Sequence, residues 1–254
     1  MLRAERISRG IDRRRAAILE VARDHLSRDG IATFTMERVA DEAGYARTAI
    51  YRYFSSREEL IVELAAESLE LRVELYRRIA RFEGRPRERI VAFGEVTCVL
   101  YPRHVLPQVF ALAHAVLEKT SESSQERLGA LQREDAELNA TVAREAVANG
   151  DLDLSLGITV EEVLFGLNAF SQGMFERMSS PPSLVGVSDP RVVLRRMGGR
   201  LLDGIGWRPL SHEWDYRATM ARIYAEVFPP RWLAARGLIE GALPETRGLK
   251  TAGR

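Results

Sequence analysis

The chain has little cysteine and no long apolar run. Its one cysteine, Cys98, can form no disulfide within the chain, and a pair of cysteine ligands for a metal is equally excluded. The amino terminus lacks the apolar stretch of a signal peptide, and no segment reaches the roughly 18 apolar residues that a membrane-spanning helix needs. We therefore expect a cytoplasmic protein with no membrane partner. With 254 residues, of which 46% are hydrophobic, the chain is long enough to bury a substantial core.

Short motifs that mark common enzyme sites are also missing. No Gly-x-Gly-x-x-Gly, Gly-x-x-x-x-Gly-Lys or Gly-x-Ser-x-Gly pattern occurs. His212-Glu213 begins like a zinc-protease motif, but Tyr216 stands where that motif needs its second histidine. His104 and His114 are ten residues apart, with no carboxylate at ligand spacing. The sequence therefore predicts no enzyme, no metal site and no cofactor.

Positive charge gathers at the start of the chain. Residues 1–15 hold six arginines against two acidic residues, a net of +4, whereas the whole chain carries only +1. This distribution indicates a local contact with a polyanion, which we assign to a basic arm over residues 1–12. The alternative is a disordered leader whose charge is incidental.

Apolar residues recur with the helical period along the chain, and neither strand alternation nor an internal repeat is visible. We expect an all-α fold. The expected helices cover about residues 12–28, 36–43, 46–53, a long helix from residue 56, and then 86–100, 105–119, 123–148, 160–178, 190–205 and 212–228. Expected helix starts are Ser56 with Glu59, Ser123 with Glu126, Thr159 with Glu162, Asp189 before Pro190, and Ser211. Expected stops are Gly30, Gly44, Gly150 and Pro229-Pro230.

The stretch "AGYARTAIYRYFSSREEL", residues 43–60, predicts a helix-turn-helix. Two short helices that cross at a tight turn need small or apolar facing residues, and Gly44 suits the turn. The inner residues are Val39, Ala40, Ala43, Ile50 and Tyr53. The other face of the second helix carries arginine, tyrosine and small residues, which suit phosphates, base edges and close approach to the major groove. Arg57, in the first turn of the next helix, is expected to hold a phosphate.

Residues 35–60, "TMERVADEAGYARTAIYRYFSSREEL", resemble the DNA-binding signature of the TetR family of bacterial regulators. The matching positions are Thr35, Val39-Ala40, Ala43-Gly44, Tyr51, Tyr53-Phe54 and Ser56-Arg57-Glu58. The sequence departs from the pattern at Ala46, Thr48 and Ala49, where Ser, Gly and Thr are common, and at Arg57, which replaces Lys. The missing hydroxyls put positions 46 and 49 in doubt as DNA contacts, whereas Arg57 keeps the charge that its role needs.

The resemblance implies a homodimer that binds double-stranded DNA at a near-palindromic operator and responds to a small apolar or amphipathic effector, acting as a repressor. It implies an amino-terminal three-helix helix-turn-helix domain, residues 13–58, and a carboxyl-terminal helical domain for ligand binding and dimerisation, residues 59–230, followed by a tail, residues 231–254. The predicted DNA contacts are Thr35, Tyr45, Arg47, Thr48, Tyr51, Arg52, Tyr53 and Arg57.

Segment 160–178 supports a dimer independently of the resemblance. It combines an apolar stripe with a second face of small residues, and a helix with two faces to bury needs two neighbours. The segment 190–205 supplies the other half of the expected four-helix interface; the alternative is that both faces lie in the core of one chain. The predicted dimer residues are Val163, Gly166, Leu167, Phe170, Gly173, Leu194 and Leu201.

The effector pocket is the least constrained prediction. Segment 98–118 mixes apolar and polar side chains, and segment 160–178 adds two amides. The predicted wall residues are Tyr101, His104, Phe110, His114, Asn168, Phe170, Gln172 and Trp207. A rival function is a helical module that binds protein or lipid; it predicts DNA binding without sequence preference and with a shallow salt dependence.

Overall fold

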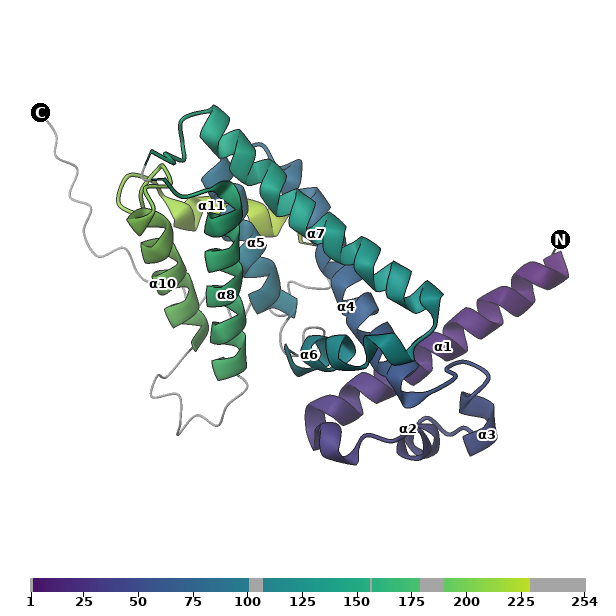
Figure 1. Cartoon of the computed structure of the whole chain (residues 1–254). Coiled ribbons are helices and arrows are strands. Elements are labelled where there is room, and N and C mark those ends of the chain that lie inside the picture. Colours follow the sequence, from purple (N-terminus) through teal and green to yellow (C-terminus); the bar gives the residue numbers. More distant parts are fainter. Residues whose placement is uncertain (1, 101–106, 156, 179–189, 229–254) are drawn as a thin grey trace, which may run out of the picture. The chain divides into compact units, whose positions relative to one another are not determined.

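A computed structural model describes residues 2–100, 107–155, 157–178 and 190–228, and all regular secondary structure in these ranges is helical (Figure 1). The α-helices are α1 (Leu2–Asp29), α2 (Met36–Glu42), α3 (Arg47–Ile50), α4 (Arg57–Ala80), α5 (Pro86–Leu100), α6 (Pro107–Val116), α7 (Glu122–Ala148), α8 (Val160–Met178), α10 (Pro190–Gly204) and α11 (Tyr216–Glu226). Two 3-10 helices, η1 (Ile31–Thr33) and η2 (Leu117–Lys119), complete the set. The predicted all-α fold is confirmed. Among these described helices, none combines the length and the apolar character needed to cross a membrane.

The chain divides into two compact units. One consists of residues 1–74 and 100–137, and the other of residues 75–99 and 138–254. Helices α4 and α7 each contribute residues to both units, so this division does not fall at the functional boundary expected between residues 58 and 59. That boundary stays a prediction.

The helix-turn-helix lies in the first unit and has a buried apolar centre. Ile18 and Ala22 of α1, Val39 of α2 and Ile50 of α3 are all 0% exposed, as the helical spacing of these residues predicts. Helix α2 packs against α1 on one side and α3 on the other (Figure 1). Helix α3 is shorter than the expected segment 46–53. Beyond Ile50 the chain tightens, because the N–H groups of Arg52 and Tyr53 donate to carbonyls three residues back, at 3.3 and 2.9 Å.

The basic amino terminus differs from the expectation of a separate arm. Helix α1 runs without a break from Leu2 to Asp29, so residues 2–12 belong to it. The composition explains this, since arginine, alanine, leucine and glutamate are good helix formers and Gly10 costs only about 1 kcal/mol relative to alanine.

Most of the predicted helix ends are found where the sequence places them. Gly30, Gly44 and Gly150 all have φ near +70°, the left-handed conformation that glycine adopts without a steric penalty. The start of α8 makes the complete capping box. The Glu162 N–H donates to the Thr159 hydroxyl at 3.2 Å, and the Thr159 N–H donates to the Glu162 carboxylate at 2.8 Å.

Two predicted helix starts are wrong in detail. The cap of α7 is Ser121 rather than Ser123, since the Ser124 N–H donates to the Ser121 hydroxyl at 3.3 Å. The cap of α11 is Asp215 rather than Ser211, and its carboxylate accepts from the N–H groups of residues 217 and 218. Ser211 is already engaged, because its N–H and hydroxyl both donate to the carboxylate of Asp203. The start expected at Asp189 and the stop at Pro229-Pro230 lie outside the described residues.

Buried ion pairs hold α5 to α10 in the second unit. Arg87 is 0% exposed, and its guanidinium donates to the Asp203 carboxylate at 2.6 Å and to the carbonyls of Gly199 and Trp207. Glu95 accepts two hydrogen bonds from Arg195, at 2.5 and 2.8 Å. A buried charge without such partners is strongly destabilising, so these contacts fix how the helices meet. Helices α8 and α10 also lie side by side (Figure 1).

Candidate nucleic-acid interface

The turn between α2 and α3 has the hydrogen bonds of a Schellman motif. The Gly44 N–H donates to the Asp41 carbonyl at 3.2 Å, and the Tyr45 N–H donates to the Ala40 carbonyl at 2.9 Å. At the other end of α2, the Thr35 hydroxyl caps the helix by accepting from the Arg38 N–H at 3.3 Å. Both ends of α2 are therefore fixed, and the direction in which α3 leaves the turn is fixed with them.

Helix α3 presents a polar outer face. Arg47, Thr48, Tyr51 and Arg52 are exposed, whereas Ile50 points into the core at 0% exposure. The Arg47 side chain is 66% exposed, and its only described ion pair is a loose one with Asp41, at 3.8 Å. Four of the eight predicted DNA contacts thus lie together on one accessible face.

The two remaining tyrosines of the predicted set are partly packed. The ring centroids of Tyr45 and Tyr53 are 6.2 Å apart, and both residues are half-buried. The Tyr53 hydroxyl accepts a long hydrogen bond, 3.5 Å, from the Arg14 guanidinium of α1. This contact joins Tyr53, which follows α3, to the basic helix α1.

Arg57 has contacts that its sequence did not predict. Its Nε donates to the Phe34 carbonyl at 2.8 Å, Nη2 donates to the Ile31 carbonyl at 3.4 Å, and its guanidinium lies 6.0 Å from the centre of the Phe34 ring. These carbonyls belong to η1 and the residue after it, so Arg57 stabilises the turn before α2. A phosphate contact by Arg57 stays a prediction and would use its remaining N–H groups.

Glu59 makes only half of its predicted capping box. Its N–H donates to the Ser56 hydroxyl at 3.1 Å, but its carboxylate accepts from the Ser121 N–H and, at 2.7 Å, from the Ser124 hydroxyl. Burial alone would raise the pKa of Glu59, but these hydrogen bonds and the positive charge of Arg15 outweigh burial and place the pKa below its usual value. The start of α4 is thereby tied to the start of α7.

A polar hollow of about 630 Å³ lies in the first unit, and residues 51–55 form part of its wall. Its lining includes Arg15, Arg52 and Arg127 together with Glu59 and Glu63. Glu63 forms ion pairs with Arg15, at 2.8 Å, and with Arg127. None of the predicted effector-wall residues lines this hollow, so it is not the effector pocket expected from the sequence.

The predicted effector residues do not gather at one described surface. Tyr101 and His104 lie outside the described residues. In the first unit, the Arg72 guanidinium lies 5.7 Å from the centre of the half-buried Phe110 ring, and His114 is exposed beside Gln132.

In the second unit, Trp207 is 0% exposed, whereas Asn168 and Gln172 are exposed. Phe170 is partly buried against a cluster that contains Cys98 and Leu194. The effector site therefore stays a prediction that these positions do not support as a set.

The predicted dimer residues form a clearer surface on α8 and α10. Val163, Gly166, Leu167 and Leu201 line an apolar hollow of about 180 Å³. Gly166 and Gly173 are exposed, and a side chain added at either glycine would meet no atom within 4 Å. Of the other predicted dimer residues, Leu194 is buried and Phe170 is partly buried. Phe165, the residue before Gly166 on α8, is 77% exposed and was omitted from the sequence-based set.

Comparison with known proteins identifies the amino-terminal part. The family described as "Bacterial regulatory proteins, tetR family" matches residues 18–64. The chain is 30% identical over 86 residues to the HTH-type transcriptional repressor KstR2 of Mycobacterium tuberculosis (strain CDC 1551 / Oshkosh), a match over 34% of this chain and 43% of the relative. It is 39% identical over 59 residues to YfiR, an uncharacterized HTH-type transcriptional regulator of Bacillus subtilis (strain 168), over 23% of this chain and 29% of the relative. The chain thus matches less than half the length of these relatives.

Solved structures extend the likeness to the whole fold. The TetR family transcriptional regulator PfmR from Thermus thermophilus matches with a TM-score of 0.59 and 18% identity, covering 73% of this chain and 97% of that one. The ketosteroid transcriptional regulator KstR2 of Mycobacterium tuberculosis matches with a TM-score of 0.59 and 19% identity, covering 76% and 95%. At such identities the likeness concerns the fold, while the sequence match concerns the helix-turn-helix. Residues 18–64 of the chain thus match the TetR family of bacterial regulatory proteins, and the described fold resembles that of TetR family regulators.

Proposed function

We propose that the protein is a sequence-specific DNA-binding regulator of transcription, a homodimeric repressor that a small ligand releases from a palindromic operator. The observation that carries the proposal is the exposed face of α3, where Arg47, Thr48, Tyr51 and Arg52 stand together while Ile50 anchors the helix. Arginine and tyrosine donors on a fixed helix suit phosphates and the edges of bases in the major groove.

A homodimer is supported by the surface of α8 and α10. Phe165 is a large apolar side chain of α8 at 77% exposure, and its neighbour in the sequence, Gly166, lines an apolar hollow. A projecting side chain and a hollow on one surface suit an isologous interface, in which each copy fills the hollow of the other. Two reading helices held in this way would meet successive major grooves about 34–36 Å apart.

For the effector, the support is indirect. The relative KstR2 is named as a ketosteroid regulator, which is consistent with an apolar or amphipathic ligand for this chain. Release from DNA would follow if the ligand bound better to a form of the dimer whose reading helices are wrongly spaced. A shift from nearly full to nearly empty operator requires a preference of about 5 kcal/mol between the two forms.

The test is selection of bound duplexes from a random DNA pool by the purified protein, with the variants Arg47→Ala and Tyr51→Ala run alongside. We expect one near-palindromic site, weakened in both variants. A phosphate contact weakens all sequences equally, whereas a base contact relaxes preference at one position by about 1–3 kcal/mol. Arg217→Ala, on the exposed side of α11, is the matched control. Equal recovery of all sequences with a shallow salt dependence would instead favour the helical interaction module.

A further inference from the structure

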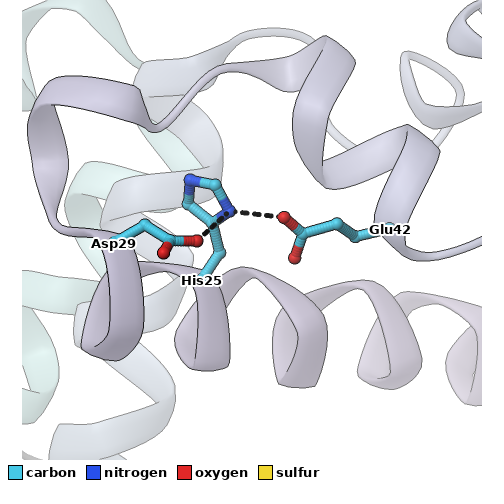
Figure 2. A group of neighbouring side chains, drawn as sticks. All are labelled: His25, Asp29 and Glu42. Carbon is cyan, nitrogen blue, oxygen red and sulfur yellow. Dashed lines mark hydrogen bonds and ion pairs between the residues drawn. The ribbon is translucent and has the colours of Figure 1, made fainter.

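In the helix-turn-helix, the carboxylates of Asp29 and Glu42 both point at one imidazole nitrogen of His25 (Figure 2). His25 lies in α1, Asp29 lies one turn further along the same helix, and Glu42 is the last residue of α2. His25 Nδ1 is 2.8 Å from Glu42 Oε1 and 3.5 Å from Asp29 Oδ2, and the three ligand atoms all lie within 4.8 Å of one another. The His25 side chain is 0% exposed, whereas each carboxylate side chain is 34% exposed.

Hydrogen bonds on the far side of the ring are compatible with a ring proton on Nε2. The Thr33 hydroxyl donates to the carbonyls of Asp29 and Gly30, at 3.2 and 3.3 Å. Its oxygen can then accept a hydrogen bond from His25 Nε2, which is 3.2 Å away. In the neutral ring, the Nδ1 lone pair then faces two carboxylates, which have no proton to donate. In this tautomer the nitrogen lone pair and the two carboxylates are arranged so that all three can bind one metal ion.

We propose that His25 Nδ1 and one oxygen each from Asp29 and Glu42 form a binding site for one divalent transition-metal ion of the zinc class. Zinc lies about 2.0–2.2 Å from imidazole nitrogen and carboxylate oxygen, so its tetrahedral ligands stand about 3.2–3.6 Å apart. The distance from Nδ1 to Asp29 fits already, and the partly exposed Glu42 needs to retreat by only about 0.5 Å. The hydrogen bond from Nε2 to Thr33 is the outer contact that a metal-bound histidine usually makes.

The two carboxylates have the charge that a metal ligand requires. Each carboxylate side chain is 34% exposed, and aspartate and glutamate carry a negative charge near neutral pH. Two negative charges match a divalent ion.

Arg28 is the cation that a metal has to displace. Its Nη2 lies 2.6 Å from Asp29 Oδ2 and 3.0 Å from Glu42 Oε1. The Arg28 side chain is 57% exposed, so it is free to turn into solvent when the carboxylates rotate towards an ion. Competition of this kind weakens metal binding without abolishing it. Removal of the Arg28 guanidinium should therefore tighten metal binding, a result that an ion-pair network without a metal site would not give.

The position of the cluster gives metal binding a structural consequence. Glu42 ends α2 two residues before the Gly44 turn, and His25 lies in the last two turns of α1. An ion bound here links the two helices that support α3 and raises the thermal stability of the folded chain by mass action. This inference does not rest on the proposed repressor function, since it requires no DNA.

The experiment is titration of the chelator-treated, untagged full chain with Co²⁺, followed by visible absorption, and then competition with Zn²⁺. We expect one ion per chain at this site. Asp29→Asn and Glu42→Gln keep the size of the side chain, and each should weaken binding by more than about 100-fold, beyond the roughly 10–100-fold loss typical of an outer-contact substitution. Glu37→Gln, a half-buried carboxylate in the first turn of α2, is the control and should bind as the unaltered chain does.

Arg28→Gln provides the decisive comparison, since removal of the competing guanidinium should tighten Co²⁺ binding at least tenfold. Circular dichroism confirms that each variant keeps its helical content, which separates ligand loss from unfolding. The proposal is overturned if no ion binds with one-to-one stoichiometry, or if binding is the same in Asp29→Asn, Glu42→Gln and the control. In either case the cluster is an ion-pair network in which Arg28 is the cation.

Discussion

Replacement of Phe165 by alanine should dissociate the proposed dimer while leaving the folded monomer intact. Phe165 is 77% exposed in a single chain, so truncation removes little that the monomer buries, and its stability should change by no more than about 0.5 kcal/mol. In the proposed interface, the same ring fills an apolar hollow of the partner. Burial of about 150 Å² of phenylalanine surface is worth about 4 kcal/mol, of which the change to alanine loses about 2–3 kcal/mol.

Symmetry doubles the effect, because each isologous interface contains the contact twice. The total loss of about 5 kcal/mol corresponds to a dissociation constant that rises by about 10³–10⁴-fold. Sedimentation equilibrium over a range of protein concentrations measures this change, and thermal unfolding at low concentration checks the monomer. Val147→Ala, an apolar residue of α7 at 37% exposure, is the matched control. A Phe165→Ala variant that dimerises as tightly as this control would refute the assignment of the interface to this face of α8.

Two further predictions concern the first unit. Arg57→Lys should lower the free energy of unfolding by about 1–3 kcal/mol, because lysine cannot reproduce the hydrogen bonds to the carbonyls of Ile31 and Phe34. The variant keeps the positive charge, so the salt dependence of DNA binding should stay unchanged. Unchanged stability in urea titrations would contradict the structural role of Arg57. The folded-state pKa of Glu59 lies below its usual value of 4.5, so its contribution to stability is present above that pH and is lost as the pH falls through the folded-state pKa. Unfolding measured below about pH 4.5 should therefore be less pH-dependent in Glu59→Gln than in the unaltered chain, and parallel curves would contradict this.

The sequence predicted best those features that depend on neighbouring residues. The turn at Gly44 and the capping box of Thr159 and Glu162 are both local, since their hydrogen bonds join residues within a few positions. The helical spacing of the core also places Val39 and Ile50 inside without knowledge of any distant contact. Local chemistry of this kind is sufficient to predict the helix-turn-helix and the exposed face of α3.

Predictions of helix caps failed where a residue outside the cap forms hydrogen bonds with the predicted capping group. Ser211 has the right chemistry to cap a helix, but Asp203 takes both of its donors and the helix starts at Asp215 instead. In the same way, the carboxylate of Glu59 accepts hydrogen bonds from Ser121 and Ser124, more than 60 positions away, instead of from the N–H group of Ser56. Such competition depends on how the chain folds around the helix start, and the capping pattern alone does not reveal it.

The cluster at His25 lies between these two cases. His25 and Asp29 stand four apart on one helix, a spacing that puts both side chains on one face and that the sequence displays openly. Glu42 joins them only because the chain reverses through η1 and α2 packs back on α1, which brings a residue 17 positions away to 2.8 Å from the ring. The same packing that orients the reading helix therefore creates the proposed metal site, so any ion held there acts on the part of the fold that positions α3.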